Sequence, residues 1–129
     1  MDQKFETPIS CFEAMTAVAF VAFSEWPVDI GIIEVGMGGE WDATNVVEAA
    51  VTVITPIGLD HMAYLGNTLT EIAKTKGGII KAGSSVVLAR QEPEAAVELM
   101  RRLAEVGAEV AREGVEYSLE KRSVAVGGQ

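Results

Sequence analysis

Residues 30–47 have the sequence Ile-Gly-Ile-Ile-Glu-Val-Gly-Met-Gly-Gly-Glu-Trp-Asp-Ala-Thr-Asn-Val-Val, and this stretch decides the fold. It begins with a β-rich apolar run that brings one acid, Glu34, to a glycine-rich loop. An acid at the carboxyl end of a buried strand lies where open α/β sheets bind ligands. The glycines that follow let a ligand approach the backbone closely. The stretch alone therefore predicts the edge of an α/β active site, with Asp42 and Asn45 nearby.

Three apolar runs predict buried strands at residues 28–35, 51–55 and 85–89. Each run is continuous rather than alternating, which is typical of a parallel sheet with helices on both faces. Weaker patterns near Val110, at 115–119 and at 122–126 suggest short terminal strands.

Helices are predicted between these strands. Ser10-Cys-Phe-Glu13 has the form of a capping box and begins a helix to about residue 24, apolar on nearly every face, as in a helix covered on both sides. A second capping box begins a helix at Thr68 that should end at residues 77–78, and Pro93 begins an amphipathic helix to Gly107. Strands and helices alternate, so the fold class is α/β, a mostly parallel sheet flanked by helices.

The length and composition of the chain are those of a single domain that is large enough to form a hydrophobic core. The chain has 129 residues, of which 49% are hydrophobic and 22% charged. Its 19 acidic and 10 basic residues argue against a nucleic-acid partner, which needs a basic surface. The longest apolar stretch, residues 14–23, is too short to cross a bilayer, and no secretory leader is recognised. No membrane association and a cytoplasmic location are expected.

Cys11, the single cysteine, is interpreted as a core residue.

Three side chains at element ends are candidates for chemistry. Glu34 ends one predicted strand, His61 follows the next strand after a turn, and Lys76 lies near the end of the following helix. Because the ends of parallel strands share one edge, Glu34 and His61 can meet in space, and carboxylate and imidazole groups can bind Mg²⁺. Each also has a simpler explanation as a loop acid, a structural histidine or a surface lysine.

Several familiar nucleotide and metal motifs are missing from the sequence. There is no Gly-x-x-x-x-Gly-Lys-Ser/Thr motif, no spaced dinucleotide fingerprint and no cysteine–histidine cluster with zinc spacing. Lys81 and the pair Arg101-Arg102 are interpreted as ordinary helix-end and surface cations.

Three blocks of sequence carry a resemblance to a known family. They are Ile-Glu-Val-Gly-Met-Gly-Gly-x-x-Asp-Ala-Thr-Asn-Val-Val at 33–47, Ile-Thr-Pro-Ile-Gly-Leu-Asp-His at 54–61 and Lys-Gly-Gly-Ile-Ile-Lys at 76–81. In this order and spacing, the chain resembles the central domain of the folylpolyglutamate synthases and bifunctional dihydrofolate synthases of the Mur ligase superfamily, over residues 8–107. The resemblance implies that residues 1–129 are the C-terminal portion of a P-loop ATPase central domain, without its P-loop segment and without the following glutamate-side domain.

The resemblance also implies an activity. An ATP-dependent ligase of this family adds L-glutamate to a folate or dihydropteroate carboxylate through an acyl phosphate, with Mg²⁺ and ATP. By similarity Glu34 and His61 are metal ligands, and Lys76 matches a lysine that carries a carbamate. Carbamylation requires a neutral amine, so such a site must lower the lysine pKa.

Five further residues match positions where the family binds the pterin end of its substrate: Ser10, Phe12, Trp41, Asp42 and Ala43. An aromatic face and a carboxylate suit a flat heterocycle that bears an amidine. For Phe12 the alternative is plain core packing.

The chain also departs from the family pattern. Glu40 stands where the family usually has Arg, Ser10 replaces a usual Thr and Gly77 a usual Ala. Without a P-loop, the isolated chain is expected to be inactive. The alternative is a natural, non-catalytic binding or assembly module of the same fold. A cell-wall amino-acid ligase is disfavoured by the Trp-Asp-Ala-Thr-Asn block.

Overall fold

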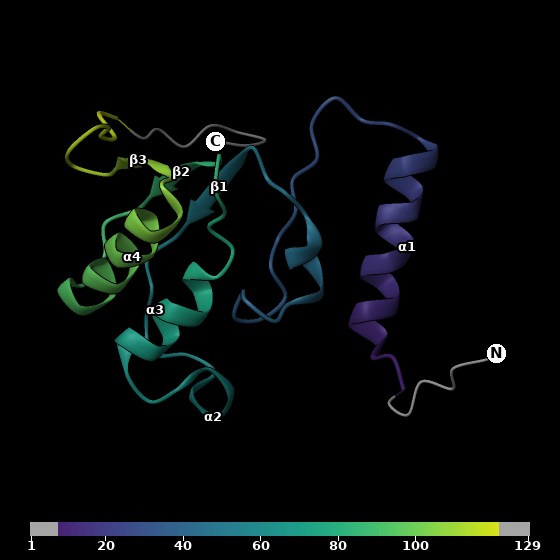
Figure 1. Ribbon diagram of the computed structural model, residues 1–129, viewed down its shortest axis with the longest axis horizontal. Helices are drawn as coiled ribbons and strands as arrows, with labels where there is room; N and C mark the ends of the chain where they lie inside the picture. The colour runs from purple at the N-terminus through teal and green to yellow at the C-terminus, as the bar shows by residue number, and fades with distance from the viewer. Residues whose placement is uncertain (1–7, 122–129) are drawn as a thin grey trace.

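The structure is a computed structural model in which residues 8–121 are described. Three parallel strands form one sheet in the order β1 (Val51–Ile54), β2 (Ser85–Leu88) and β3 (Glu109–Arg112). Each pair is joined through helices, as parallel neighbours require: α2 (Met62–Leu65) and α3 (Leu69–Gly77) precede β2, and α4 (Pro93–Val106) precedes β3 (Figure 1). The predicted α/β class is confirmed.

The core lies between the sheet and the pair of helices α3 and α4. Ile72 of α3 and Leu99 of α4 are fully buried, and Ile80 and Val86 join them. Figure 1 shows the two helices side by side next to the strands. The capping box at Thr68 and the proline at the first turn of α4 begin these helices as predicted.

Only one face of the sheet is covered by the part of the chain that the structure describes. Along β1, Thr52 and Ile54 are buried while Val51 and Val53 are exposed. The prediction of strands covered on both faces is therefore wrong here. Burial alternates because α3 and α4 occupy one side and no described helix occupies the other.

The first helix, α1 (Cys11–Glu25), begins at the predicted capping box. Ser10 Oγ accepts from the Glu13 backbone N–H at 3.2 Å, and the Glu13 carboxylate accepts from the Ser10 N–H at 2.7 Å. The helix has no buried residue, and Cys11 is exposed, so both the covered helix and the core cysteine were wrong predictions. Figure 1 shows why, because α1 lies apart from α3 and α4.

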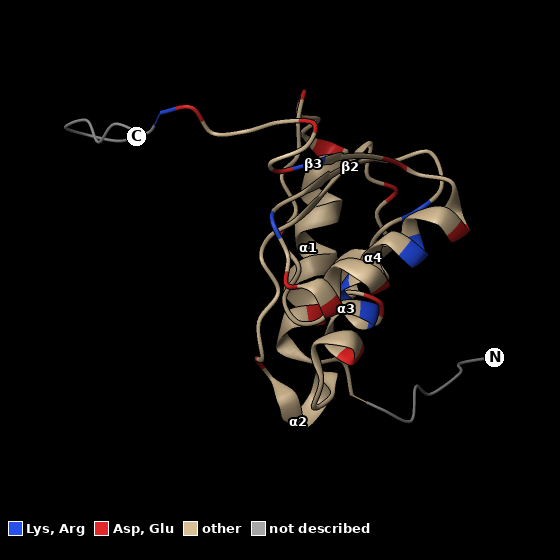
Figure 2. Cartoon of the chain, turned by 90° about the vertical axis from the view of Figure 1, so that its left-hand side faces the viewer, with Lys and Arg blue, Asp and Glu red and all other residues tan. Residues whose placement is uncertain are grey.

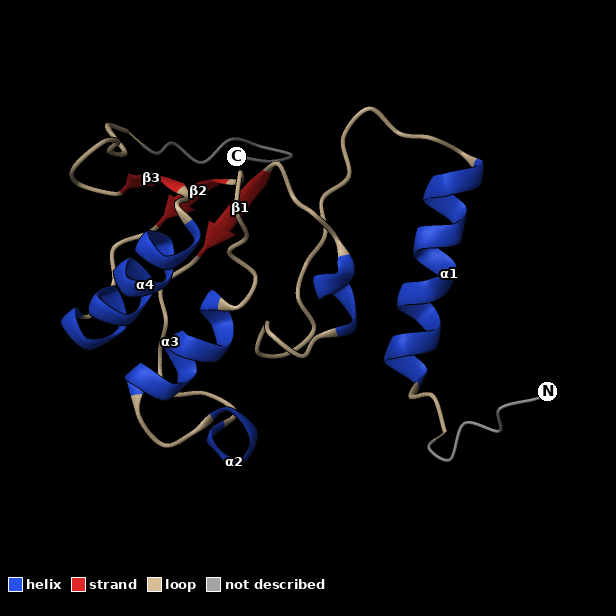
Figure 3. Ribbon diagram, in the orientation of Figure 1, coloured by secondary structure: helices blue, strands red, loops and turns tan. Residues whose placement is uncertain are grey.

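The predicted strand at residues 28–35 is also wrong. This segment belongs to the long irregular connection that follows α1 (Figure 3), and Ile30 and Ile32 are 82% and 92% exposed. A strand needs a hydrogen-bonded neighbour, and none of the described strands pairs with this segment.

The remaining predictions concern the two ends of the chain. The weak pattern near Val110 is confirmed as β3. Residues 115–119 form no strand beyond an isolated bridge between Glu113 and Tyr117. Residues 122–126 lie outside the described part of the chain. Among the described residues, no helix is long and apolar enough to span a membrane.

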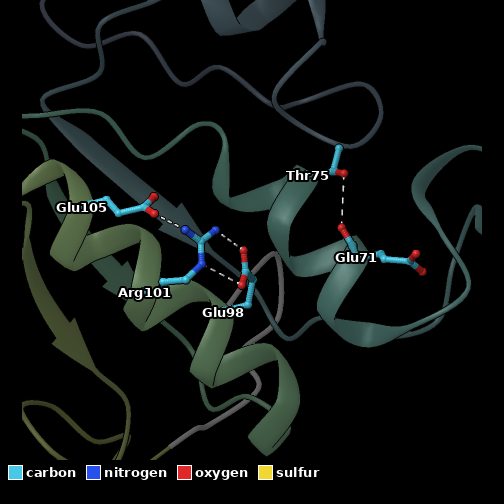
Figure 4. Close-up of polar contacts among 5 residues, drawn as sticks. All are labelled: Glu71, Thr75, Glu98, Arg101 and Glu105. Atoms are coloured by element: carbon cyan, nitrogen blue, oxygen red, sulfur yellow. Dashed lines mark hydrogen bonds and ion pairs between the residues drawn. The ribbon is translucent and has the colours of Figure 1, made fainter.

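Charged side chains are unevenly distributed. Acidic and basic residues are interspersed on α3 and α4, whereas α1 carries few charges (Figure 2). On α4, Arg101 pairs with both Glu98 and Glu105 (Figure 4). Hydrogen bonding from Arg101 lowers the pKa of the nearly buried Glu98 carboxyl.

Candidate functional site

The glycine-rich loop is organised around the carboxylate of Asp42. Its Oδ1 accepts from the Thr44 backbone N–H at 2.9 Å and from the Thr44 hydroxyl at 2.6 Å, so Asp42 caps the short 3₁₀ helix η1 (Ala43–Val46). Its Oδ2 accepts from the Met37 N–H at 2.9 Å. Burial acts to raise the Asp42 pKa, but these hydrogen bonds outweigh it, and the pKa is lowered overall. Both carboxylate oxygens of Asp42 thus accept hydrogen bonds that fix the conformation of the loop.

The loop packs closely against the start of α1. The ring of Phe12 lies against Gly36, where an added Cβ would come within 2.3 Å of Phe12 Cζ. Phe12 nevertheless remains 43% exposed. Phe12 is therefore not a core residue. One side of its ring packs against Gly36, and part of the ring remains accessible.

The loop also packs closely against the C-terminal end of α3. A Cβ on Gly39 would lie 2.8 Å from the Thr75 carbonyl oxygen and 2.9 Å from that of Lys76. The Glu40 N–H donates to the same Thr75 carbonyl at 2.9 Å. Only a residue without a side chain allows this approach, which places the Asp42 loop beside the helix end that carries Lys76.

A cavity of about 580 Å³ opens between these elements. The start of α1, the glycine-rich loop, α2 and α3 all contribute to its wall. The lining residues are Ser10, Phe12, Glu13, Gly36, Met37, Gly39, Trp41, Asp42, Ala43, Tyr64, Leu65 and Thr75. All five residues predicted to contact the pterin are among them, although they come from two segments separated by nearly thirty residues of sequence.

The two predicted metal ligands lie outside this lining. Glu34 is exposed in the irregular segment before the loop, and His61 is exposed before α2. The His61 backbone adopts a left-handed conformation with φ of 49°, and its Nε2 lies 3.5 Å from Asp60 Oδ2. Among residues 8–121, no group of three or more His, Cys, Asp or Glu side chains is gathered in a way that could hold a metal ion. The metal assignment remains a prediction.

Lys76 is half-buried in the last turn of α3, one residue after Thr75, which lines the cavity. Its neighbour Lys74 is exposed on the same helix. The role of Lys76 as a carbamate carrier also remains a prediction.

Lys81 was not recognised from the sequence as a residue of this region, and the contacts of Asn45 were not foreseen. The Lys81 ammonium donates to the carbonyl oxygens of Asn45 at 2.6 Å and Val47 at 2.9 Å, and Asn45 Nδ2 donates to the carbonyl of Gly78 at 3.4 Å. The interpretation of Lys81 as an ordinary helix-end cation is wrong, because its charge serves main-chain carbonyls more than thirty residues away. The sequence carried a signal for this, since Lys81 ends the third recognised block.

Comparison with known proteins extends this description. The Mur ligase middle domain matches residues 8–125, nearly the whole chain. The chain belongs to this family.

Relatives within the family carry consistent names. The chain is 46% identical over 127 residues to a Mycobacterium tuberculosis dihydrofolate synthase/folylpolyglutamate synthase, covering 94% of this chain and 26% of the relative. It is 39% identical to a Lacticaseibacillus casei folylpolyglutamate synthase, covering 98% of this chain and 30% of the relative. A solved FPGS–AMPPCP–folate complex superposes with a TM-score of 0.88 at 39% identity, over 93% of this chain and 29% of that one.

This Mur ligase middle domain thus spans between a quarter and a third of the length of these relatives. The similarity confirms the resemblance drawn from the three sequence blocks and the fold that it implied.

Proposed function

We propose that this chain is part of an ATP-dependent ligase that joins L-glutamate to the carboxyl group of folate or dihydropteroate. In this reaction the substrate carboxylate takes the γ-phosphoryl group of ATP and forms an acyl phosphate, with ADP as the leaving group. The glutamate amine then attacks the acyl carbon and forms the amide, and inorganic phosphate leaves. The names of the relatives support the proposal, since they are folylpolyglutamate and dihydrofolate synthases. We propose the cytoplasm as the compartment.

The cavity beside α1 holds the pterin end of the substrate in this proposal. Phe12 and Trp41 offer aromatic surfaces for a flat heterocycle, and Ser10 and Ala43 complete the wall. Asp42 lies in the same wall, and its lowered pKa keeps the carboxylate ionised at neutral pH, which suits an amidine N–H of the ligand.

Glu34 and His61 are the residues that we assign to Mg²⁺. Their donor chemistry fits, because Mg²⁺ is usually held by one or two carboxylates together with water and substrate phosphates rather than by a complete protein cage. When bound, the ion neutralises charge on phosphoryl oxygens. Lys76 near the cavity contributes an anion in its carbamylated form, which requires that the amine lose its proton before it reacts with CO₂.

A single observation carries the proposal: the five residues predicted for the pterin line one cavity. The test is a titration of the ¹⁵N-labelled chain with folate, followed by two-dimensional NMR. Binding at this cavity shifts the amide signals of residues 36–43 and spares those of α4, and Phe12→Ala weakens it. Absence of shifts at millimolar folate in a folded chain, or shifts spread over α4, would contradict the proposal.

We also propose that the 129-residue chain alone does not hydrolyse ATP. Its sequence contains no P-loop motif, whose backbone N–H groups cradle the phosphates. Folate- and glutamate-dependent release of ADP by the pure chain would disprove this. The same assay on a chimera, in which residues 8–125 replace the matching segment of the M. tuberculosis relative, should show turnover.

A further inference from the structure

Lys81 stands in the turn between α3 and β2, yet its side chain reaches the far end of η1. The ammonium group donates to the carbonyl oxygens of Asn45 at 2.6 Å and Val47 at 2.9 Å. Carbonyls at the end of a helix have no partner within it, and a cation there satisfies them and complements the helix dipole. Asp42 caps the other end of the same element. The short helix η1 is therefore held at one end by a carboxylate and at the other by an ammonium.

Asn45 supplies a second connection between the same two segments. Its Nδ2 donates to the Glu40 carbonyl at 3.1 Å and to the Gly78 carbonyl at 3.4 Å. The Glu40 N–H in turn donates to the Thr75 carbonyl at 2.9 Å. Residues 40–47 are thus attached to residues 75–81 at both ends, by hydrogen bonds that join positions more than thirty residues apart.

The attachment joins the two halves of the candidate site. Trp41, Asp42 and Ala43 lie between its anchoring points and form one wall of the cavity, while Lys76 lies within the segment that holds them. We infer that Lys81 is a positioning residue, which fixes this wall relative to the helix end that bears Lys76. The inference rests on the proposed function only where it concerns the ligand.

A lysine suits this role better than a neutral side chain. Hydrogen bonds from an ionised donor are stronger than neutral ones, and one ammonium can serve two carbonyls at once. Removal of the charge leaves both carbonyls without this donor. In Lys81→Met the aliphatic stem remains but the donors are lost, so we expect residues 40–47 to detach from the end of α3. In Lys81→Arg a charged donor remains, so we expect most of the attachment to be restored.

A matched control exists on the same turn. Arg102 of α4 donates from Nη2 to the Ile80 carbonyl at 2.9 Å, which is the same kind of cation–carbonyl contact one residue earlier. It reaches the turn from α4, and its hydrogen bond goes to Ile80 rather than to residues 40–47. Arg102→Met therefore tests whether the loss of any hydrogen bond to this turn is enough to speed amide exchange in residues 40–47.

The experiment measures amide hydrogen exchange and folate affinity in the wild type and in three variants, Lys81→Met, Lys81→Arg and Arg102→Met. We expect Lys81→Met to speed exchange at the Glu40, Thr44 and Asn45 amides by about tenfold or more, the factor for losing a hydrogen bond to a charged group. Exchange in β2 should not change. Lys81→Arg should restore slow exchange, and Arg102→Met should leave it slow. Folate affinity should fall by a similar factor in Lys81→Met alone.

The outcomes separate the two proposals. Equal exchange in Lys81→Met and the wild type, or equal acceleration in Arg102→Met, overturns the inference about Lys81. Unchanged folate affinity in Lys81→Met, despite fast exchange in the loop, also overturns its positioning role for the ligand. If the wild type binds no folate, the proposed function fails, while fast loop exchange in Lys81→Met with rescue by arginine still supports the attachment.

Discussion

The helices α1 and α4 are both rich in apolar residues, but they are packed in opposite ways. In α4, Ala95, Leu99 and Leu103 recur every fourth residue and are buried against α3 and the sheet. In α1 no residue is buried, although apolar side chains lie on nearly every face. Apolar side chains alone therefore do not bury a helix, because burial depends on whether a partner surface is present. Within residues 8–121, the part after residue 50 contains the packed body, and most of the part before it is exposed.

The candidate site lies where these two regions meet. The exposed region supplies the start of α1 and the glycine-rich loop, and the body supplies α2 and α3. Close packing at Gly36 and Gly39 and the hydrogen bonds of Lys81 hold the regions together. Substitutions in the packed body and in the exposed region before residue 50 can test this difference between them.

The largest expected effect is on catalysis. In the chimera with the M. tuberculosis relative, Lys76→Ala should lower kcat by about 100-fold or more, the usual cost of removing one electrostatic group from an active site. Acetate should restore part of the activity by replacing the missing anion. The control is Lys74→Ala, which removes an exposed lysine from the same helix turn. Wild-type turnover in Lys76→Ala would make Lys76 a surface lysine.

The second effect compares packing in the two regions. Ile72 is fully buried in α3, so Ile72→Ala should lower the free energy of unfolding by about 2–5 kcal/mol. Val18 in α1 is 69% exposed, so Val18→Ala should change the free energy of unfolding by no more than about 0.5 kcal/mol. Urea unfolding of each variant measures this free energy. A similar loss in the two variants would show that α1 is packed in solution.

The sequence predicted the body well because each of its elements carries its own local signals. Capping boxes, the proline at the start of α4 and β-rich runs all depend on neighbours within a few residues. Two predictions failed: the strand at residues 28–35 and the burial of α1. Both depend on a partner surface, which no local pattern describes. The sequence shows that these segments are apolar, but it does not show what surrounds them.

The candidate site was predictable to a similar extent. The family resemblance singled out five residues that lie together in the lining of one cavity, although Ser10 and Phe12 fall outside the three sequence blocks; their role in binding stays a prediction. The attachment through Lys81 was missed because it joins positions 81, 45 and 47, and its acceptors are backbone carbonyls, which have no sequence identity.

An intermediate effect is expected at Asp42. Asp42→Ala removes the cap of η1 and should cost about 1 kcal/mol, measured by urea unfolding. Because folding lowers the Asp42 pKa, its ionisation stabilises the fold above the pKa of an unfolded aspartate. This stabilisation is lost as pH falls through the lowered folded-state value. The difference between the wild type and Asp42→Ala should therefore shrink in acid. A difference that grows in acid would contradict the lowered pKa.

The smallest effect gives the most direct comparison, because the two regions contain the same capping motif. Ser10 and Glu13 cap α1, and Thr68 and Glu71 cap α3, each pair through reciprocal hydrogen bonds. These bonds lower the pKa of both glutamates, so both boxes are intact above the pKa of an unfolded glutamate and weaken as pH falls through the folded values.

Loss of each cap should nevertheless have different consequences. Thr68→Ala should lower the free energy of unfolding by about 1 kcal/mol, because α3 is part of the core. Ser10→Ala should leave that quantity unchanged and only speed amide exchange at Glu13, since a helix without buried contacts can fray without unfolding the body. If Ser10→Ala destabilises the whole chain as much as Thr68→Ala does, α1 and the body unfold as one cooperative unit. The contact of Phe12 with Gly36 would then be the first candidate for what couples them.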